Sequence, residues 1–127
     1  MAVYQGADSC YALNEQIYVR RLRRSGVDTV REAAGILYLV LRDYRRGWTY
    51  RQGDCKKTRM TENLFEKRVR FVAALAKIHG APRAAREAIE RLVEHVLKKK
   101  RLPKTVQVGS RRLSVRKLVE EALARKR

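Results

Sequence analysis

The chain has 127 residues, a formal net charge of +18 at pH 7, and a hydrophobic content of 45%. This length and apolar content suffice for one folded domain and exclude a disordered basic tail. The longest apolar run, residues 36–41, is far too short to cross a bilayer, and no signal-peptide pattern opens the sequence. We therefore expect a single domain over residues 1–127, with no transmembrane segment and an intracellular address.

The positive charge lies in two separated blocks. Residues 1–19 carry a net charge of −2, residues 20–59 carry +8, residues 60–95 carry +2 and residues 96–127 carry +10. Arginine outnumbers lysine by about two to one, and its planar fork of donors suits phosphate. A charge this large opposes compaction unless a polyanion neutralises it, so nucleic acid is the first expected partner.

The N-terminal part is predicted to be an arm followed by a helix. Residues 1–7 form the arm, and Asp8 or Ser9 caps a first helix that Gly26 ends. Arg20, Arg21, Arg23 and Arg24 close this helix, which leads into the next one as a basic αα-hairpin, and the arm and the hairpin together occupy residues 1–47.

A second helix is predicted after Gly26. Thr29 and Glu32 have the spacing of a capping box, and an apolar stripe then continues to a stop at Gly47. Residues 47–60 mix aromatic and polar side chains, which predicts a loop with at most a short extended piece.

Two further amphipathic helices are predicted between Thr61 and Arg101. Thr61 caps the first of them and Gly80 ends it, while Pro82 stands in the first turn of the second. The basic residues 98–101 suit the negative end of the helix dipole.

The C-terminal part is predicted to be a short β-hairpin and a last helix. Val106 and Val108 alternate with polar residues, a turn follows, and Ser114 then caps the helix. The expected fold class is all-α: the basic αα-hairpin is followed by a helical bundle over residues 61–127, with one short β-hairpin near 105–113.

One face of the second helix is predicted to be continuously basic. Its members fall within about 100° of one another around the axis: Arg31, Tyr38, Arg42, Arg45 and Arg46. Gly35 lies among them, and glycine in a helix costs roughly 1 kcal/mol relative to alanine, which indicates that a phosphate backbone or another helix comes close there. The alternative is an ordinary charged face opposite a core. Only Asp43, at the margin, compensates the arginines.

We predict phosphate contacts from the cations of the first block and of the third helix. They are Arg20, Arg21, Arg23, Arg24, Arg31, Arg42, Arg45, Arg46, Arg51, Lys56, Lys57, Arg59, Lys67 and Arg70. For the last basic block, residues 98–104 and 125–127, a solvated tail and a nucleic-acid contact both stay open. Trp48 and Tyr50 flank a basic loop, where base stacking and burial in a core or interface are the competing interpretations.

No catalytic set is expected. Asp43, Asp54 and Lys56 echo the D…DxK pattern of a magnesium-dependent nuclease family, but that pattern needs paired strands behind it, and Asp43 falls in a predicted helix. The two cysteines and two histidines match no ligand spacing, so no metal or cofactor is expected, and pairing of Cys10 with Cys55 stays open.

The architecture resembles the major coat proteins of filamentous and rod-shaped viruses of hyperthermophilic archaea. The resemblance rests on the basic hairpin of residues 20–46 and on the helices of residues 61–101. It implies many copies wrapped around double-stranded DNA in the A form, each paired with itself or with a paralogous coat subunit. It also implies hairpin arginines that face the DNA and later helices that build the outer wall. The stretch after Pro103 and the charged C-terminus depart from those coats.

The expected function is therefore that of a non-enzymatic virion coat that packages double-stranded DNA without sequence specificity. Such a coat is assembled in the host cytoplasm and takes no small-molecule substrate. Two alternatives stay open, a helical small subunit of an archaeal CRISPR effector complex and a cellular chromatin protein. DNA against RNA, and homodimer against heterodimer, stay open as well.

Overall fold

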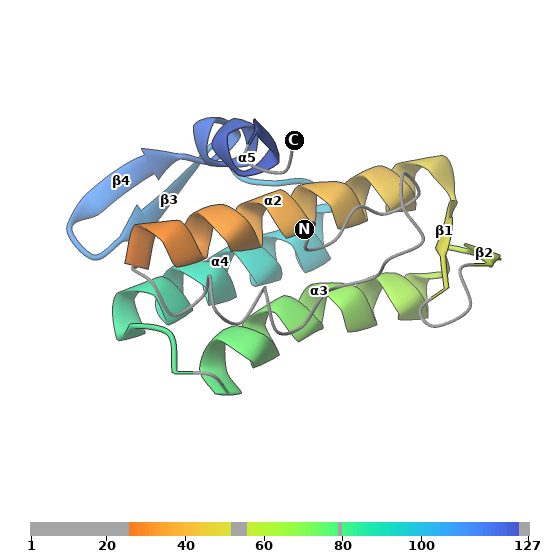
Figure 1. Ribbon diagram of the computed structural model, residues 1–127, viewed down its shortest axis with the longest axis horizontal. Coiled ribbons are helices and arrows are strands. Elements are labelled where there is room, and N and C mark those ends of the chain that lie inside the picture. The colour runs from red at the N-terminus through yellow and green to blue at the C-terminus, as the bar shows by residue number, and fades with distance from the viewer. Residues whose placement is uncertain (1–25, 52–55, 79, 125–127) are drawn as a thin grey trace.

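The computed structural model describes residues 26–51, 56–78 and 80–124. The helices are α2 (Gly26–Arg46), α3 (Glu62–Ile78), α4 (Arg83–Lys99) and α5 (Val115–Ala124), and the strands are β1 (Trp48–Tyr50), β2 (Lys57–Arg59), β3 (Thr105–Val108) and β4 (Arg111–Ser114) (Figure 1). The predicted all-α bundle with a short C-terminal hairpin is confirmed. The predicted arm and first helix, with Arg20, Arg21, Arg23 and Arg24, lie outside the described residues.

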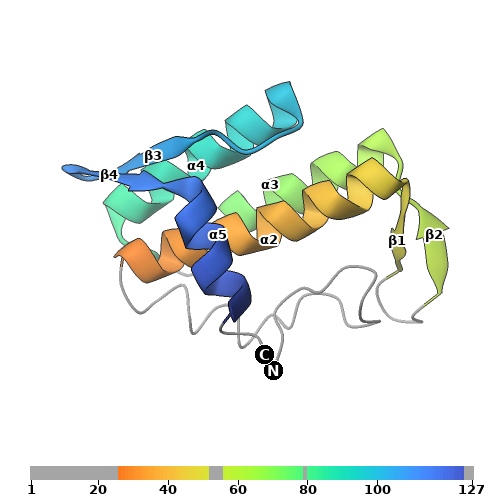
Figure 2. The same cartoon turned by 90° about the horizontal axis from the view of Figure 1, so that it is seen from above.

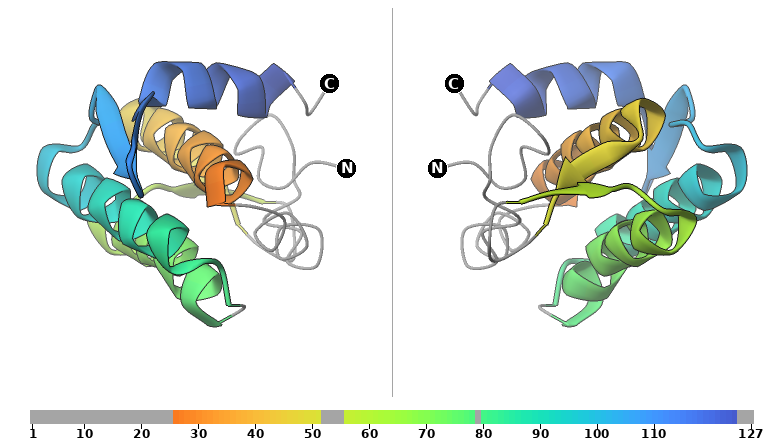
Figure 3. Two further views of the ribbon diagram at one scale, coloured as in Figure 1. Left: turned by 90° about the vertical axis from the view of Figure 1, so that its left-hand side faces the viewer. Right: turned by 90° about the vertical axis from the view of Figure 1, so that its right-hand side faces the viewer.

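Helix α2 is the central element of the bundle. It contacts α3, α4 and α5, with α3 and α4 on one side and α5 lying across another (Figures 2 and 3). Val30, Ala33 and Leu37 are completely buried, and Leu41 is almost so. Because its neighbours share this core with it, α2 belongs to the same packed unit as residues 61–124.

The start of α2 differs from the prediction. The helix already includes Gly26, and Asp28 supplies an acidic side chain in its first turn, where negative charge stabilises the dipole. Thr29 and Glu32 therefore lie inside the helix, and both are buried. The predicted capping box is wrong because α2 begins at Gly26, so Thr29 is not its N-cap residue.

The predicted boundaries of α3 and α4 are close to those observed. The backbone N–H of Leu64 donates to Thr61 Oγ1 at 3.1 Å, which confirms Thr61 as the cap of α3. Gly80 follows α3 with a φ of 72°, and Pro82 is the N-cap residue of α4. At the other end of α4, Lys100 adopts a left-handed conformation and its N–H donates to the Val96 carbonyl at 2.9 Å.

The hairpin of β3 and β4 is antiparallel, with Val106 opposite Leu113. Val106 and Val108 are buried, and β3 packs on α4. The N–H of Lys117 donates to Ser114 Oγ at 3.3 Å, so Ser114 caps α5 as predicted. This hairpin returns the chain from the end of α4 to the start of α5.

A second antiparallel hairpin, β1 and β2, replaces part of the predicted loop. Trp48 lies opposite Arg59, and Tyr50 opposite Lys57. Gly47 has a φ of 84° and joins α2 to β1, while the N–H of Met60 donates to the Gly47 carbonyl at 2.9 Å. The prediction allowed a short extended piece here but not the pairing of two strands, and Thr49 and Tyr50 of β1 are held by contacts with α2 and α3 that the local sequence does not report.

Candidate nucleic-acid interface

A buried carboxylate fastens the β1–β2 hairpin to the bundle. Asp43 is completely buried, and its Oδ2 accepts a hydrogen bond from the Thr49 hydroxyl at 2.7 Å. Arg68 of α3 donates to Thr49 Oγ1 at 2.6 Å and to the Tyr50 carbonyl at 2.9 Å. This network ties α2, β1 and α3 together at one point.

The same carboxylate also contacts two arginines of α2. Arg46 Nη2 donates to Asp43 Oδ1 at 2.5 Å, and Arg42 Nε lies 3.7 Å from the same oxygen. The side chains of Arg42 and Arg46 are 28% and 27% exposed. The prediction that Asp43 stands at the margin of the basic face is wrong, because Asp43 lies under that face and holds these two arginines to it.

The predicted basic face of α2 is not continuous. A Cβ placed on Gly35 would lie 2.8 Å from the Ala122 Cβ, so α5 crosses the face at this glycine. Arg31, one turn before the crossing, pairs with Asp28 and with Glu121, which lies 3.1 Å away, and its side chain is only 13% exposed. Of the two explanations for Gly35, the close approach of another helix is the observed one.

The outer face of the β1–β2 hairpin carries aromatic rings among cations. Arg46 lies over the Trp48 ring at 4.4 Å from its centroid, and Lys57 lies over the same ring at 4.2 Å. The Tyr50 ring meets Trp48 edge-on at 5.7 Å. Trp48 thus holds two cations by cation–π attraction, which positions them at the surface. Arg59, opposite Trp48, is exposed beside them.

The C-terminal end of α4 lies next to the start of α3. Lys100 Nζ lies 3.8 Å from Glu62 Oε2 and 5.4 Å from the centroid of the Phe65 ring. Tyr44 of α2 donates to the other oxygen of Glu62 at 2.5 Å, and this hydrogen bond raises the pKa of Tyr44. The last basic block is therefore fixed beside the C-terminal half of α2, with Lys98 and Lys99 exposed.

We call the resulting surface the basic end: residues 42–51, 56–62 and 98–104. It holds twelve cationic residues and two acidic ones, Asp43 and Glu62. Asp43 is buried and Glu62 is paired with Lys100, so neither offsets the surface charge widely. Of the net +14 carried by the described residues, +10 lies here. Most of these cations belong to the C-terminal ends of α2 and α4 or to the segments that follow them.

Ten of the fourteen predicted site residues are described by the structure, and they fall into three groups; Arg20, Arg21, Arg23 and Arg24 lie outside the described residues. The basic end contains Arg42, Arg45, Arg46, Arg51, Lys56, Lys57 and Arg59. Lys67 and Arg70 are exposed on α3, apart from that group, and Arg31 is drawn into ion pairs. The predicted set lacks Lys98, Lys99, Arg101 and Lys104, which the fold brings to the same surface. The only sign of these residues in the sequence is the high charge of the last basic block. The position of that block relative to α2 is set by tertiary packing, which the sequence does not show directly.

The pKa of His95 is affected by its burial and by nearby positive charges. Burial lowers the pKa of His95, and the charges of Arg101 and Lys99 lower it further. Its Nε2 is buried and has no hydrogen-bond partner among the described residues. Neutral imidazole is therefore the form that suits the fold.

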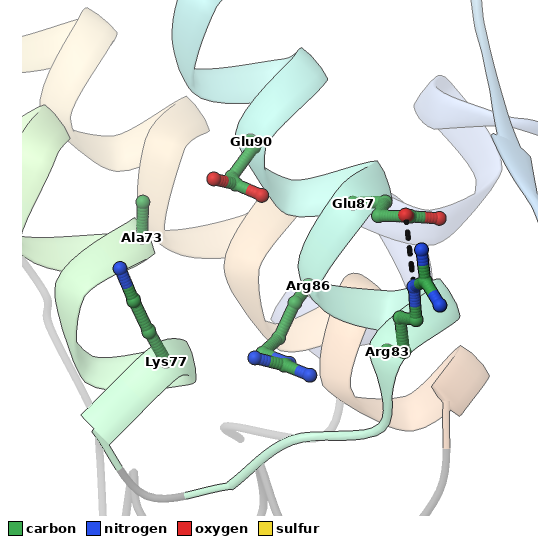
Figure 4. Close-up of a pocket in the computed structure, with 6 residues that line it drawn as sticks. All are labelled: Ala73, Lys77, Arg83, Arg86, Glu87 and Glu90. Carbon is green, nitrogen blue, oxygen red and sulfur yellow. Dashed lines mark hydrogen bonds and ion pairs between the residues drawn. The ribbon is translucent and has the colours of Figure 1, made fainter.

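A cavity of about 230 Å³ between α3 and α4 is a weaker candidate for an anion site. Lys77, Arg83 and Arg86 share it with Glu87 and Glu90 (Figure 4). Arg83 Nε donates to Glu87 Oε2 at 3.3 Å, the interaction marked in that view. The mixed charges leave it far less basic than the surface at the other end of these helices.

The described residues contain no group of three His, Cys, Asp or Glu side chains that could hold a metal ion. Nor does any helix among them have the length and apolarity needed to span a membrane. Of the D…DxK pattern, Asp43 lies sealed in the core with Thr49 and Arg46 as partners, and Asp54 is outside the described residues.

Comparison with protein-family models, with curated proteins and with solved structures finds no match.

Proposed function

We propose that this chain is a structural, non-enzymatic protein that packages double-stranded DNA as a virion coat, holding phosphates at the basic end without reading sequence. The observation that carries the proposal is the convergence of two basic blocks, far apart in the sequence, on one surface. The blocks meet where Lys100 Nζ lies 3.8 Å from Glu62 Oε2, and Arg59, Lys98 and Lys99, which lie within three residues of that contact in the sequence, are exposed. A dense cluster of solvent-facing cations supplies the sequence-independent part of nucleic-acid binding.

The way in which the cations around Trp48 are held supports contact with the phosphate backbone over the reading of bases. Trp48 has Arg46 and Lys57 against its ring, so its π-system is engaged by the protein's own cations. Asp43 in turn fixes Arg46 from below. Cations held in this way present a rigid array of charge, which suits the regular spacing of phosphates along a duplex.

Electron microscopy of the isolated protein, combined with nuclease treatment and absorbance at 260 nm, tests the proposal. We expect filaments of regular diameter that contain nuclease-resistant double-stranded DNA. Protein that carries no protected nucleic acid and binds none when it is added at low salt would contradict nucleic-acid packaging. Discrete dimers on DNA would point to a chromatin role, and binding that needs other proteins would point to a CRISPR effector subunit.

A further inference from the structure

A groove of about 460 Å³ lies beside the basic end, between α2, residues 101–104 and α5. Its walls are largely apolar: Leu41, Val115 and Val119 are buried, and Leu102 is partly buried. Protein sites for small organic ligands have volumes of about 300 to 1,000 Å³ and mostly apolar walls. A groove of this size accepts one flat ring system, whereas an intact duplex is too large to enter it.

Tyr38 supplies an aromatic ring on the α2 side of the groove. It is 38% exposed and forms no ring contact within the described part of the chain. Trp48, by contrast, has Arg46 and Lys57 against its ring. Bases of any identity stack on aromatic side chains, because every base has a π-face. The Tyr38 ring therefore offers a stacking surface that Trp48 does not.

The rim of the groove is part of the basic end. Arg45, Arg101 and Lys104 line it, and their side chains form no hydrogen bond or ion pair with any residue that the structure describes. The groove has one acidic residue, Glu120, which pairs with Arg116 at 3.4 Å. Cations around an apolar floor complement a ligand that has phosphates outside a flat apolar ring. A nucleic-acid strand held by these cations passes the open side of the groove.

We propose that the groove holds the base of an unpaired nucleotide, with the base against Tyr38 and the neighbouring phosphates on Arg45, Arg101 and Lys104. This binding rests on the proposed function, because the same cations hold the nucleic-acid backbone in both cases. Tyr38 and Arg45 are seven residues apart in α2, so they lie on one face of the helix. A base within a duplex must first be unpaired and unstacked, whereas a base at a strand end or in a gap is already free. The protein therefore prefers duplexes with an unpaired end to blunt ones.

Fluorescence anisotropy with the full chain and three labelled duplexes tests the proposal. One duplex is blunt, one carries a short single-stranded overhang of thymidines, and one carries an overhang of abasic nucleotides of the same length. The two overhangs have the same phosphates, so only the bases distinguish them. We expect the thymidine overhang to bind about fivefold or more tightly than the abasic one, as one stacked base provides. Equal affinities for the two overhangs would overturn the proposal.

Tyr38→Ala should remove the difference between the two overhangs and leave the affinity for the blunt duplex nearly unchanged. Tyr38→Phe keeps the ring and should keep the preference. The matched control is Phe71→Ala, which removes a ring of 37% exposure on α3, outside the groove. It should behave like the wild type, and circular dichroism should show all variants folded. If Tyr38→Ala retains the preference, the base binds elsewhere and the assignment of the groove is wrong.

The blunt duplex reports on the proposed function separately. A protein that binds it tightly but does not distinguish the two overhangs disproves the groove site alone. A protein that binds the thymidine overhang but neither of the other duplexes contradicts duplex packaging and supports the groove site. A protein that binds none of the three at low salt contradicts both.

Discussion

Gly35 of α2 and Ala122 of α5 lie so close that a Cβ at position 35 would come within 2.8 Å of the Ala122 Cβ. Ala122 is buried, as are Val115, Leu118 and Val119 on the same side of α5. Moving α5 away from α2 would therefore expose these apolar side chains to water. A glycine in the middle of α2 is explained by this crossing, in which the Ala122 methyl group occupies the space that a side chain at position 35 would need.

Gly35→Ala is expected to destabilise the protein by about 1–3 kcal/mol, which is typical of an overpacked core. The better helix propensity of alanine, worth about 1 kcal/mol, offsets part of the strain. Chemical denaturation followed by circular dichroism measures the difference in the free energy of unfolding.

The double variant Gly35→Ala/Ala122→Gly is the control, because it moves the methyl group from one helix to the other. We expect it to be more stable than the sum of the two single variants indicates, by about 1 kcal/mol or more. Strictly additive free energies would contradict the contact.

Asp43→Ala is expected to destabilise the protein by about 3 kcal/mol, the loss associated with breaking a buried ion pair. The substitution leaves the Thr49 hydroxyl and the Arg46 guanidinium without their shared acceptor. Because Trp48 is the only tryptophan and lies against Arg46, its fluorescence should change with the loosened hairpin.

Glu87→Ala provides the matched comparison, since it also removes one carboxylate from an ion pair. Its partner is Arg83, and both side chains are largely exposed. We expect a loss below about 1 kcal/mol for this surface pair. Equal effects at positions 43 and 87 would show that Asp43 is not the fastening point described above.

His95 makes stability depend on pH. Its folded pKa lies below its ordinary value near 6.5, chiefly because of burial and further because of Arg101 and Lys99. The neutral ring therefore contributes stability above about pH 6.5, and this contribution is lost as the pH falls from there toward the folded pKa. His95→Gln should unfold with a shallower dependence on pH across that window. Parallel curves for the two proteins would contradict the shift.

Arg59→Ala/Lys98→Ala/Lys99→Ala should flatten the dependence of DNA affinity on salt. Each lost phosphate contact lowers the slope of log K against log salt by up to about 0.9 for a duplex. Fluorescence anisotropy with duplexes of unrelated sequence gives both the slope and the absence of sequence preference.

The matched variant Lys77→Ala/Arg111→Ala/Lys117→Ala removes the same charge from exposed positions outside the basic end. Its slope should stay near that of the wild type. If both triple variants lose the same slope, binding follows net charge alone and the basic end has no special place in it.

Local signals in the sequence predicted much of the fold. Thr61 and Ser114 cap helices through hydrogen bonds to N–H groups only three residues away, so their effect is visible within one turn. Val106 and Val108 alternate with polar neighbours, and both are buried as that alternation predicts. Such features need no knowledge of the rest of the chain.

The candidate site was less predictable because segments that are distant in the sequence build it. In the sequence, Asp43 cannot be distinguished from an acidic residue on the surface of a helix. Only the folded structure shows that Thr49 donates to it and that Arg68 donates to Thr49. From the sequence, Gly35 is compatible with both a phosphate contact and a helix crossing. The position of α5 in the structure identifies the helix crossing. Lys98 and Lys99 follow α2 by some fifty residues, and only the packing of α4 on α2 and α3 brings this end of α4 close to the start of α3.

The uneven placement of charge gives the described part of the molecule a large electric dipole. With +10 of its +14 at one end of the bundle, the protein experiences a torque in the field of any polyanion. The basic end therefore turns toward the polyanion while the two are still separated by solvent. Orientation precedes contact, and successive molecules arrive facing the same way.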